Sequence, residues 1–307
     1  MVHGTHNAIE DERNAHIKIS INGEFFHRKD AKISVFDSGY LVGDGIWEAF
    51  RLHKGVLVFL DAHLDRMWQA AATVGMTLPF SKEELVSDVR KVLDANSMKD
   101  HVHVRVMITR GIKKTPSQDP RLTISGPNVV IIAEHKQASV ETKQTGITLF
   151  TSTIRRGSPD YLDPRLNCHS KLHEVQALVQ AIEAGADEAL MLDVHGFVST
   201  CNATNFFIVK NEEIWTSTGQ YCMNGITRGK VIEACAKFGI ICHQKTFSLF
   251  DVYGADEAFV TGTFGGLTPV TKIDGRIIGK GTYGSTTKKL SELYNKLIEE
   301  EVNQNKI

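Results

Sequence analysis

The sequence predicts a two-domain protein of the α/β (α+β) class, and three of its features support this prediction. The chain has 307 residues, which is long for one hydrophobic core and comfortable for two domains. Apolar residues alternate with polar ones at 101–109, as in a half-buried strand. They recur every three to four residues at 61–75 and 172–182, as in an amphipathic helix. Strands and helices are therefore expected in both halves of the chain.

Composition favours a small-molecule partner. The formal net charge is −1 and no basic run occurs, which argues against nucleic-acid binding and against a membrane-attracted face. The five cysteines lack paired metal-ligand spacing, so we expect no metal site. Because the N-terminus has no apolar signal segment and the cysteine number is odd, we expect a reduced, cytoplasmic protein.

Four segments are expected along the chain. Residues 1–15 are polar and aperiodic, which predicts a flexible arm, and 16–150 form an N-terminal α/β domain. Residues 151–165 carry Gly and Pro and are interpreted as an interdomain segment. Residues 166–307 then form a C-terminal domain.

The N-terminal domain is expected to begin with a hairpin around Asn22-Gly23, because this dipeptide suits a tight turn between two apolar runs. A strand follows at 46–52, and its alternation puts Trp47 and Glu48 on opposite faces. A helix is predicted from Asp61 to Gly75, with Arg66 beside its buried stripe.

A second helix is predicted at 81–96, because Ser81 and Glu84 have the spacing of a capping box. The following strand, 101–109, places His103 and Arg105 on one face. Another strand is expected at 129–133, after a Pro-rich surface loop.

The C-terminal domain is predicted to open with a helix whose apolar stripe, from Leu172 to Ile182, faces inward and whose first turn contains Lys171. A hairpin at 188–200 and a strand at 206–209 follow. Gly225-Ile-Thr opens a further helix, 257–261 is strand-like, and a C-terminal helix begins near Thr286.

Five short segments, in this order and with these gaps, resemble the class IV (fold type IV) aminotransferases, a family that includes branched-chain and D-amino acid aminotransferases. The matching segments are Gly43-Asp-Gly-Ile-Trp-Glu48, His63-Leu-Asp-Arg66, Gly185-Ala-Asp-Glu-Ala, Asn224-Gly-Ile-Thr-Arg228 and Asp256-Glu-Ala-Phe-Val-Thr-Gly-Thr263. The resemblance covers nearly the whole chain.

This resemblance implies a two-domain fold with an N-terminal α/β sandwich and a C-terminal pseudo-barrel. It also implies a homodimer that uses pyridoxal 5'-phosphate to transfer an amino group between an amino acid and a 2-oxo acid. The C-terminal domain would then bind the cofactor.

The resemblance assigns several residues to the cofactor. Arg66, the helix start at Ile226-Thr227 and Thr263 match the groups that hold the cofactor phosphate in the family. A helix start suits a phosphate, because its unpaired amides and dipole attract an anion. The loop of Thr200, Asn202 and Ala203 would lie against the cofactor ring.

Two central positions depart from the family pattern. Counting back from Glu188 places Asn167 where the family has the lysine that binds the cofactor covalently, and Lys171 falls one helical turn later. We interpret Lys171 as the catalytic lysine, displaced along the helix. Thr200 stands where the family usually has a glutamate that pairs with the ring nitrogen.

These departures leave two alternatives open. Thr200 would weaken the cofactor as an electron sink, which favours a lyase or racemase on the same fold. Asn167 favours a relative that works without covalent cofactor chemistry. Trp47, His103, Arg105 and Phe264 match substrate-binding positions of the family, and an arginine fork suits a carboxylate.

Overall fold

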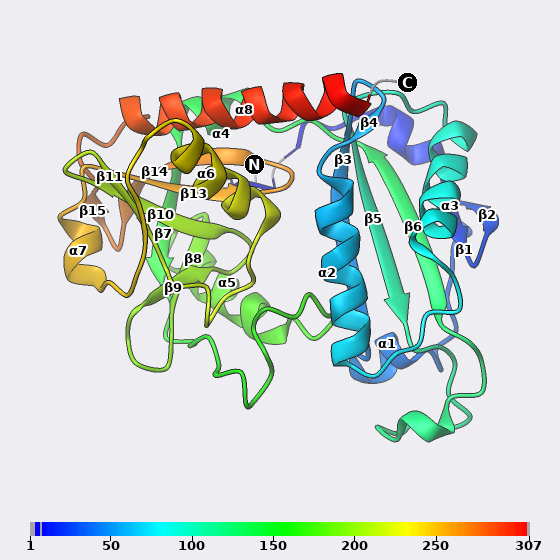
Figure 1. Ribbon diagram of the computed structural model, residues 1–307. Helices are drawn as coiled ribbons and strands as arrows, with labels where there is room; N and C mark the ends of the chain where they lie inside the picture. Colours follow the sequence, from blue (N-terminus) through cyan, green and yellow to red (C-terminus); the bar gives the residue numbers. More distant parts are fainter. Residues whose placement is uncertain (1–3, 7, 306–307) are drawn as a thin grey trace. The chain divides into compact units, whose positions relative to one another are not determined.

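The computed structural model describes residues 4–6 and 8–305, and these fold into two compact units (Figure 1). The N-terminal unit comprises Glu10–Gln137 and Leu166–Lys171, with the described residues Gln304 and Asn305. The C-terminal unit comprises the described part of Met1–Ile9 together with Ala138–Arg165 and Leu172–Asn303. The short segment 166–171 is thus separated in sequence from the rest of its unit.

The N-terminal unit is built on a six-stranded antiparallel sheet with strand order β2-β1-β6-β5-β3-β4. The strands are β1 (Lys18–Ile21), β2 (Glu24–His27), β3 (Gly45–His53), β4 (Val56–Leu57), β5 (Val102–Thr109) and β6 (Asn128–His135). The helical segments are η1 (Glu12–His16), α1 (Ser38–Val42), α2 (Leu60–Thr73), α3 (Lys82–Ala95) and η2 (Pro120–Leu122). The predicted hairpin at Asn22-Gly23 is confirmed, and both turn residues have positive φ.

The core of this unit lies on one face of the sheet, against α2 and α3. Leu64 and Met67 of α2 and Val89 of α3 are buried there with Val104 and Val106 of β5. The capping box predicted at Ser81 and Glu84 is present, and both hydrogen bonds form. Because β5 alternates, its other residues, His103 and Arg105, lie on the opposite face of the sheet.

The C-terminal unit is built on a nine-stranded mixed sheet. Its order is β12-β11-β10-β13-β14-β7-β8-β9, with β15 added beside β14. The strands are β7 (Ile147–Thr151), β8 (Glu188–Leu192), β9 (Val198–Cys201), β10 (Asn205–Lys210), β11 (Glu213–Thr216), β12 (Cys242–Gln244), β13 (Glu257–Gly262), β14 (Gly266–Ile273) and β15 (Arg276–Ile277). The helices are α4 (Val140–Thr145), α5 (Leu172–Glu183), α6 (Ile226–Lys237), α7 (Leu249–Tyr253) and α8 (Ser285–Asn305).

This sheet curls on itself. Its last strand, β9, is joined by residues 202–204 to β10, which lies further inside the same sheet, and the Cys201 amide donates to the Thr204 carbonyl at 2.8 Å. The interior is filled by apolar side chains of facing strands, among them Leu190, Phe206 and Val260. The mixed helix-and-sheet fold and the curled, pseudo-barrel form of this unit agree with the fold expected from the sequence.

Helix α5 differs from its prediction in which face is buried. Ala177 and Ala181 are fully buried against Ala189 and Met191 of β8, whereas the predicted inward stripe is largely outside. Leu172, Val175, Val179 and Ile182 are 70, 53, 47 and 61% exposed. The small alanines let the helix lie close to the sheet, which turns the bulky residues outward. The prediction of the buried face was therefore wrong, although the helix itself is present.

Parts of the expected arm are described by the structure. Residues 1–3 and 7 lie outside the described residues. Thr5 binds Glu188 through its amide, at 3.2 Å, and through its hydroxyl. Ala8 forms an isolated bridge with Ala138, and Glu12–His16 form η1.

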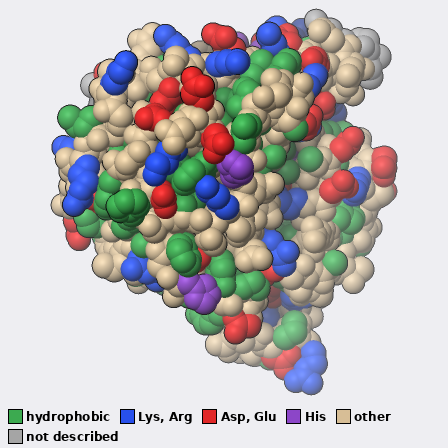
Figure 2. Space-filling model, turned by 60° about the vertical axis from the view of Figure 1, so that its left-hand side comes forward, with side chains coloured by type: hydrophobic (Ala, Val, Ile, Leu, Met, Phe, Trp, Pro, Cys, Tyr) green, Lys and Arg blue, Asp and Glu red, His purple; other side chains and the backbone are tan. Residues whose placement is uncertain are grey.

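Among the described residues, no helix is long and apolar enough to cross a membrane. Figure 2 shows acidic and basic side chains interspersed over the visible face, in keeping with the small net charge.

Candidate active site

The start of α6, in the C-terminal unit, is a candidate anion-binding position. Gly225 is the N-cap of the helix, and as a glycine it makes no side-chain cap hydrogen bond to the first amides. Those amides, which include Ile226 and Thr227, have no intrahelical partner and carry the positive end of the helix dipole. Thr227 is buried, so its hydroxyl and amide lie in an environment with little water.

Asn205 ties this helix start to the strands. Its Nδ2 donates to the Met223 carbonyl at 2.9 Å and to Thr200 Oγ1 at 3.3 Å, and its Oδ1 accepts from the Gly225 amide at 3.2 Å. A Cβ on Gly225 would lie 2.3 Å from Asn205 Oδ1, so only glycine fits at the cap. Asn205, the first residue of β10, was not predicted as a site residue, because no local sequence pattern signals these contacts.

The loop after β9 is held by its own hydrogen bonds. Thr200 Oγ1 donates to the Thr204 carbonyl at 2.8 Å, so its hydroxyl proton already has an acceptor. The Asn202 backbone amide donates to the Ala189 carbonyl at 3.0 Å, and Asn202 Oδ1 accepts from the Ala189 amide at 2.8 Å. Ala203 is exposed. The predicted ring-contacting residues thus belong to one rigid loop.

Thr263 and Phe264 follow the end of β13. Thr263 is half-buried and Phe264 is buried. Thr261, which pairs with Asn205 across the strands, is 2% exposed, and its hydroxyl oxygen has no hydrogen-bond partner among the described residues. A buried hydroxyl without a partner costs free energy, which favours a polar ligand or water near this strand end.

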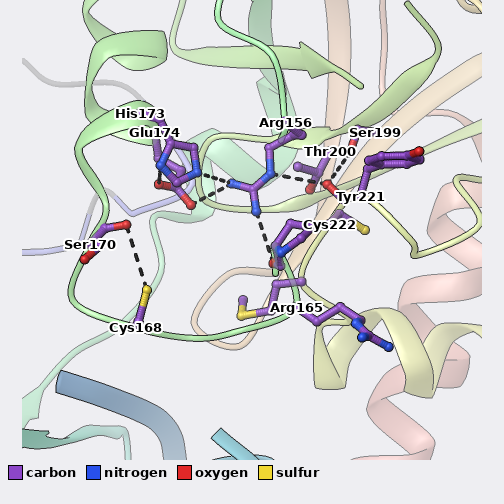
Figure 3. Close-up of polar contacts among 12 residues, drawn as sticks. Arg156, Arg165, Cys168, Ser170, His173, Glu174, Ser199, Thr200, Tyr221 and Cys222 are labelled. Atoms are coloured by element: carbon purple, nitrogen blue, oxygen red, sulfur yellow. Dashed lines mark hydrogen bonds and ion pairs between the residues drawn. The ribbon is translucent and has the colours of Figure 1, made fainter. Parts of the chain in front are cut away.

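Arg156 fixes the chain that leads into α5, as Figure 3 shows. It is 3% exposed; Nη1 donates to Glu174 Oε1 at 2.7 Å and contacts His173 Nε2 at 2.9 Å. Nη2 donates to the Pro164 carbonyl at 3.1 Å and Nε to that of Tyr221 at 3.3 Å. Because Glu174 lies in the first turn of α5, these contacts anchor the start of the helix.

Lys171 immediately precedes α5, which begins at Leu172, rather than lying in its first turn as predicted. Its side chain is half-buried. Asn167 is 2% exposed and is paired with β3: its Nδ2 donates to the Trp47 carbonyl at 2.7 Å, and its backbone carbonyl accepts from the Trp47 amide at 3.0 Å, while its side-chain Oδ1 has no hydrogen-bond partner among the described residues. Asn167 is therefore held as a structural residue by the backbone of β3.

Arg66 is held by a buried carboxylate in the N-terminal unit. Its Nε and Nη2 donate to Glu48 at 2.6 and 2.8 Å, and His63 Nδ1 lies 2.7 Å from Glu48 Oε2. Burial alone would raise the pKa of Glu48, but Arg66 and His63 together lower it. Burial lowers the pKa of His63, so neutral His63 donates to the carboxylate. This network orients Arg66 and was not predicted from the sequence.

A polar pocket of about 270 Å³ lies on the face of the N-terminal sheet opposite α2 and α3. His103 and Arg105 both line it, as their two-residue spacing predicted. The pocket is also lined by three charged residues that the sequence did not predict there, Arg28, Glu134 and Lys136. Two-residue spacing places Glu134 and Lys136 on the same side of the chain as Ile132, which also lines the pocket. The pocket therefore carries an excess of cationic side chains.

Arg105 lies over the Trp47 ring, 4.3 Å from its centroid, and Trp47 Nε1 donates to the Cys168 carbonyl at 3.1 Å. Among the described residues, no carboxylate lies within ion-pair distance of Arg105. Desolvation lowers the pKa of Arg105, and the more distant Glu134 partly offsets this. The guanidinium is thus oriented by an aromatic ring and available to a carboxylate.

The fold and these positions define a family. A family model described as "Amino-transferase class IV" matches residues 45–273, which is most of the chain. The chain therefore belongs to the class IV aminotransferases.

Its relatives include the "Branched-chain-amino-acid aminotransferase-like protein 2" of Arabidopsis thaliana, which is 39% identical over 92% of this chain and 51% of its own length. The "Putative branched-chain-amino-acid aminotransferase" of Methanocaldococcus jannaschii is 38% identical, over 91% of this chain and 95% of its own. The chain spans about half the length of the two Arabidopsis thaliana relatives it matches.

The crystal structure of the branched-chain amino acid aminotransferase of Escherichia coli is similar, with a TM-score of 0.85. It is 26% identical and covers 93% of this chain and 96% of its own. Class IV aminotransferases are pyridoxal-phosphate enzymes. The α6 start fits the phosphate of that cofactor, since it supplies helix N-terminal amides and positive potential behind an N-cap glycine that has no capping side chain.

Proposed function

We propose that this protein is a pyridoxal-phosphate-dependent aminotransferase that moves an amino group between an amino acid and a 2-oxo acid. The observation that carries the proposal is the open start of α6 in a chain of the class IV family. The cofactor supplies an electron sink that lets the α-carbon of the amino acid lose a proton. The protein groups bind and orient the substrate and move that proton.

In this proposal the phosphate is held by the amides of Ile226 and Thr227 and by Thr263, with Arg66 as the cationic partner. These groups supply hydrogen-bond donors and positive charge, which a phosphate dianion requires. Thr200, Asn202 and Ala203 lie along the ring. Their loop is already rigid, so little ordering is required on binding.

Lys171 is proposed as the lysine that binds the cofactor covalently and carries the proton. Asn167 has no amine, and its amide is committed to the Trp47 carbonyl, so it cannot take this role. The Arg156–Glu174 ion pair, with both side chains nearly buried, holds the helix start next to Lys171. Lys171 immediately precedes this anchored helix start in the chain.

The substrate carboxylate is proposed to bind in the pocket of His103 and Arg105; Trp47 and Phe264, which do not line this pocket, are the other residues proposed to contact the substrate. Arg105 is suited to this because its guanidinium is oriented by Trp47 and is not paired with any described carboxylate. The proposed substrates are therefore an amino acid and a 2-oxo acid, and their side chains are left open.

A lyase or racemase activity is a second candidate, favoured by Thr200. Its hydroxyl proton is donated to the Thr204 carbonyl, so Thr200 does not replace the family glutamate as a partner of the ring nitrogen. A weaker electron sink would leave slow transamination, racemisation and elimination all open.

We also propose that the protein is a cytoplasmic homodimer. All five cysteines are free, as expected in a reducing compartment. The exposed stripe of α5, from Leu172 to Ile182, offers apolar surface for a second subunit. Light scattering on the purified protein measures the subunit number, and a monomer at micromolar concentration would contradict the dimer.

The activity is tested with an amino acid labelled with ¹⁵N at its amino group, incubated with pyridoxal phosphate in the presence and absence of a 2-oxo acid acceptor. An aminotransferase moves the label to the acceptor. Ammonia or the opposite enantiomer without an acceptor would instead support the lyase or racemase. Arg105→Ala should raise KM for the amino acid, whereas Arg121→Ala, an exposed arginine on η2, is the control.

A further inference from the structure

His53, Asp100 and His101 form a cluster at one end of the N-terminal sheet, and none of the three lines the pocket of His103 and Arg105. His53 is the last residue of β3, and Asp100 and His101 immediately precede β5. Leu52 pairs with Val102, so the register brings the residues on either side of that pair together. The cluster therefore follows from antiparallel pairing of two strands whose ends carry imidazole and carboxylate groups.

The spacing of the donor atoms fits one metal ion. His53 Nδ1 lies 3.2 Å from Asp100 Oδ1, and His101 Nε2 lies 3.7 Å from Asp100 Oδ2. One ligand atom from each residue can be chosen so that all three lie within 4.8 Å of one another. Zinc bonds of about 2.0–2.1 Å at tetrahedral angles require ligand atoms about 3.3–3.5 Å apart. Small side-chain rotations suffice to meet this geometry.

The carboxylate is oriented before any ion binds. Asp100 Oδ1 accepts hydrogen bonds from the Lys54 amide at 2.9 Å and the His101 amide at 2.7 Å. Both donors are backbone groups, so they hold the side chain against rotation. The side chains of His53, Asp100 and His101 are 16, 35 and 52% exposed, which leaves the cluster open to an ion from solvent.

We propose that His53, Asp100 and His101 bind a divalent transition-metal ion of the zinc type. Two imidazoles and one carboxylate suit Zn²⁺, Co²⁺ or Ni²⁺, whereas Mg²⁺ and Ca²⁺ prefer oxygen ligands. Three protein ligands leave a further coordination position to water. The site was not predicted from the sequence, because His53 and Asp100 lie 47 residues apart in the chain and are brought together only by the fold.

The test is a calorimetric titration of the protein with Zn²⁺, after dialysis against a chelator. We expect one Zn²⁺ site in the wild type. His53→Ala and His101→Ala should each bind Zn²⁺ about tenfold more weakly or weaker still, since each variant loses one of three ligands. His27→Ala is the matched control, because His27 is an exposed histidine of β2 in the same unit and should not change the affinity.

Asp100→Asn separates metal binding from folding. The amide oxygen can still accept from the two backbone amides, so the fold should be kept, but the anionic ligand is lost and Zn²⁺ should bind more weakly. Co²⁺ should give a visible ligand-field spectrum in the wild type that His101→Ala lacks. Equal Zn²⁺ affinity in His101→Ala and His27→Ala, or Mg²⁺ binding as tight as Zn²⁺ binding, would overturn the proposal.

Discussion

Replacing Arg66 by alanine should affect both stability and cofactor binding, and the structure allows the two effects to be separated. Arg66 donates two hydrogen bonds to Glu48, whose side chain is 1% exposed. Without Arg66, the buried carboxylate keeps only His63. Removing one partner of a buried ion pair costs about 3 kcal/mol or more, because the remaining charge is uncompensated. In a domain of this size the melting temperature should fall on the order of 10 °C.

The same variant should bind pyridoxal phosphate less tightly. Loss of a charge-assisted hydrogen bond to the phosphate costs about 2 kcal/mol, which corresponds to roughly a 30-fold weaker affinity. This effect comes from the proposed contact with the ligand and not from the ion pair with Glu48.

The double variant Arg66→Ala/Glu48→Gln distinguishes the two effects. A neutral amide removes the uncompensated charge, so much of the lost stability should return, while cofactor affinity should stay low. Thermal unfolding without cofactor and calorimetric titration with cofactor measure the two quantities. Wild-type affinity in the double variant would refute the phosphate role of Arg66, and an unchanged melting temperature in Arg66→Ala would refute the structural role of the ion pair.

The α6 cap, the buried His63–Glu48 pair and Cys242 each give a further prediction. Gly225→Ala should weaken cofactor binding about tenfold, measured by titration, because its Cβ would collide with Asn205 Oδ1 and displace the α6 start. The free energy of unfolding should fall as pH drops below about 6.5, because the unfolded chain then protonates His63, whereas the folded state, in which the pKa of His63 is lowered, does not. It should fall again at lower pH, where the unfolded chain protonates Glu48 before the folded state does, since the folded state also lowers the pKa of Glu48. A flat profile in denaturant titrations from pH 8 to 5 would contradict this. Cys242 should react with iodoacetamide before the other four cysteines, because it is half-buried while they are buried and because its pKa is lowered. Peptide mapping of the alkylated protein measures this order.

Local sequence signals predicted the elements whose cause is local. The capping box of α3 and the Asn22-Gly23 turn depend on a few neighbouring residues and are present as expected. Short elements such as α1, α7 and β12 were missed, because five or fewer residues give no measurable period. Their formation depends on tertiary contacts.

The buried face of α5 was mispredicted for a physical reason. Periodicity identifies the bulky apolar stripe, but the close approach of α5 to β8 selects Ala177 and Ala181 instead. The outward stripe then requires another explanation, which the proposed dimer supplies. A sequence pattern alone does not tell whether an apolar face is buried within a subunit or between subunits.

The candidate site was predictable only as far as single residues carry a signal. The alternation of β5 placed His103 and Arg105 together, and the glycine-led start of α6 was identified as an anion position. The Glu48–His63–Arg66 network and the bridging role of Asn205 join residues distant in sequence. Such contacts are fixed by the fold and not by any local pattern.

The central claim is that Lys171 has taken over from the lysine expected at position 167. Protein loaded with pyridoxal phosphate should be reduced with borohydride, digested and mapped by peptide mass spectrometry. The account predicts a pyridoxyl group on Lys171, and Lys171→Ala should lose the visible cofactor absorbance while still binding the phosphate. A label on another lysine, or no cofactor uptake even at high concentration, would contradict it.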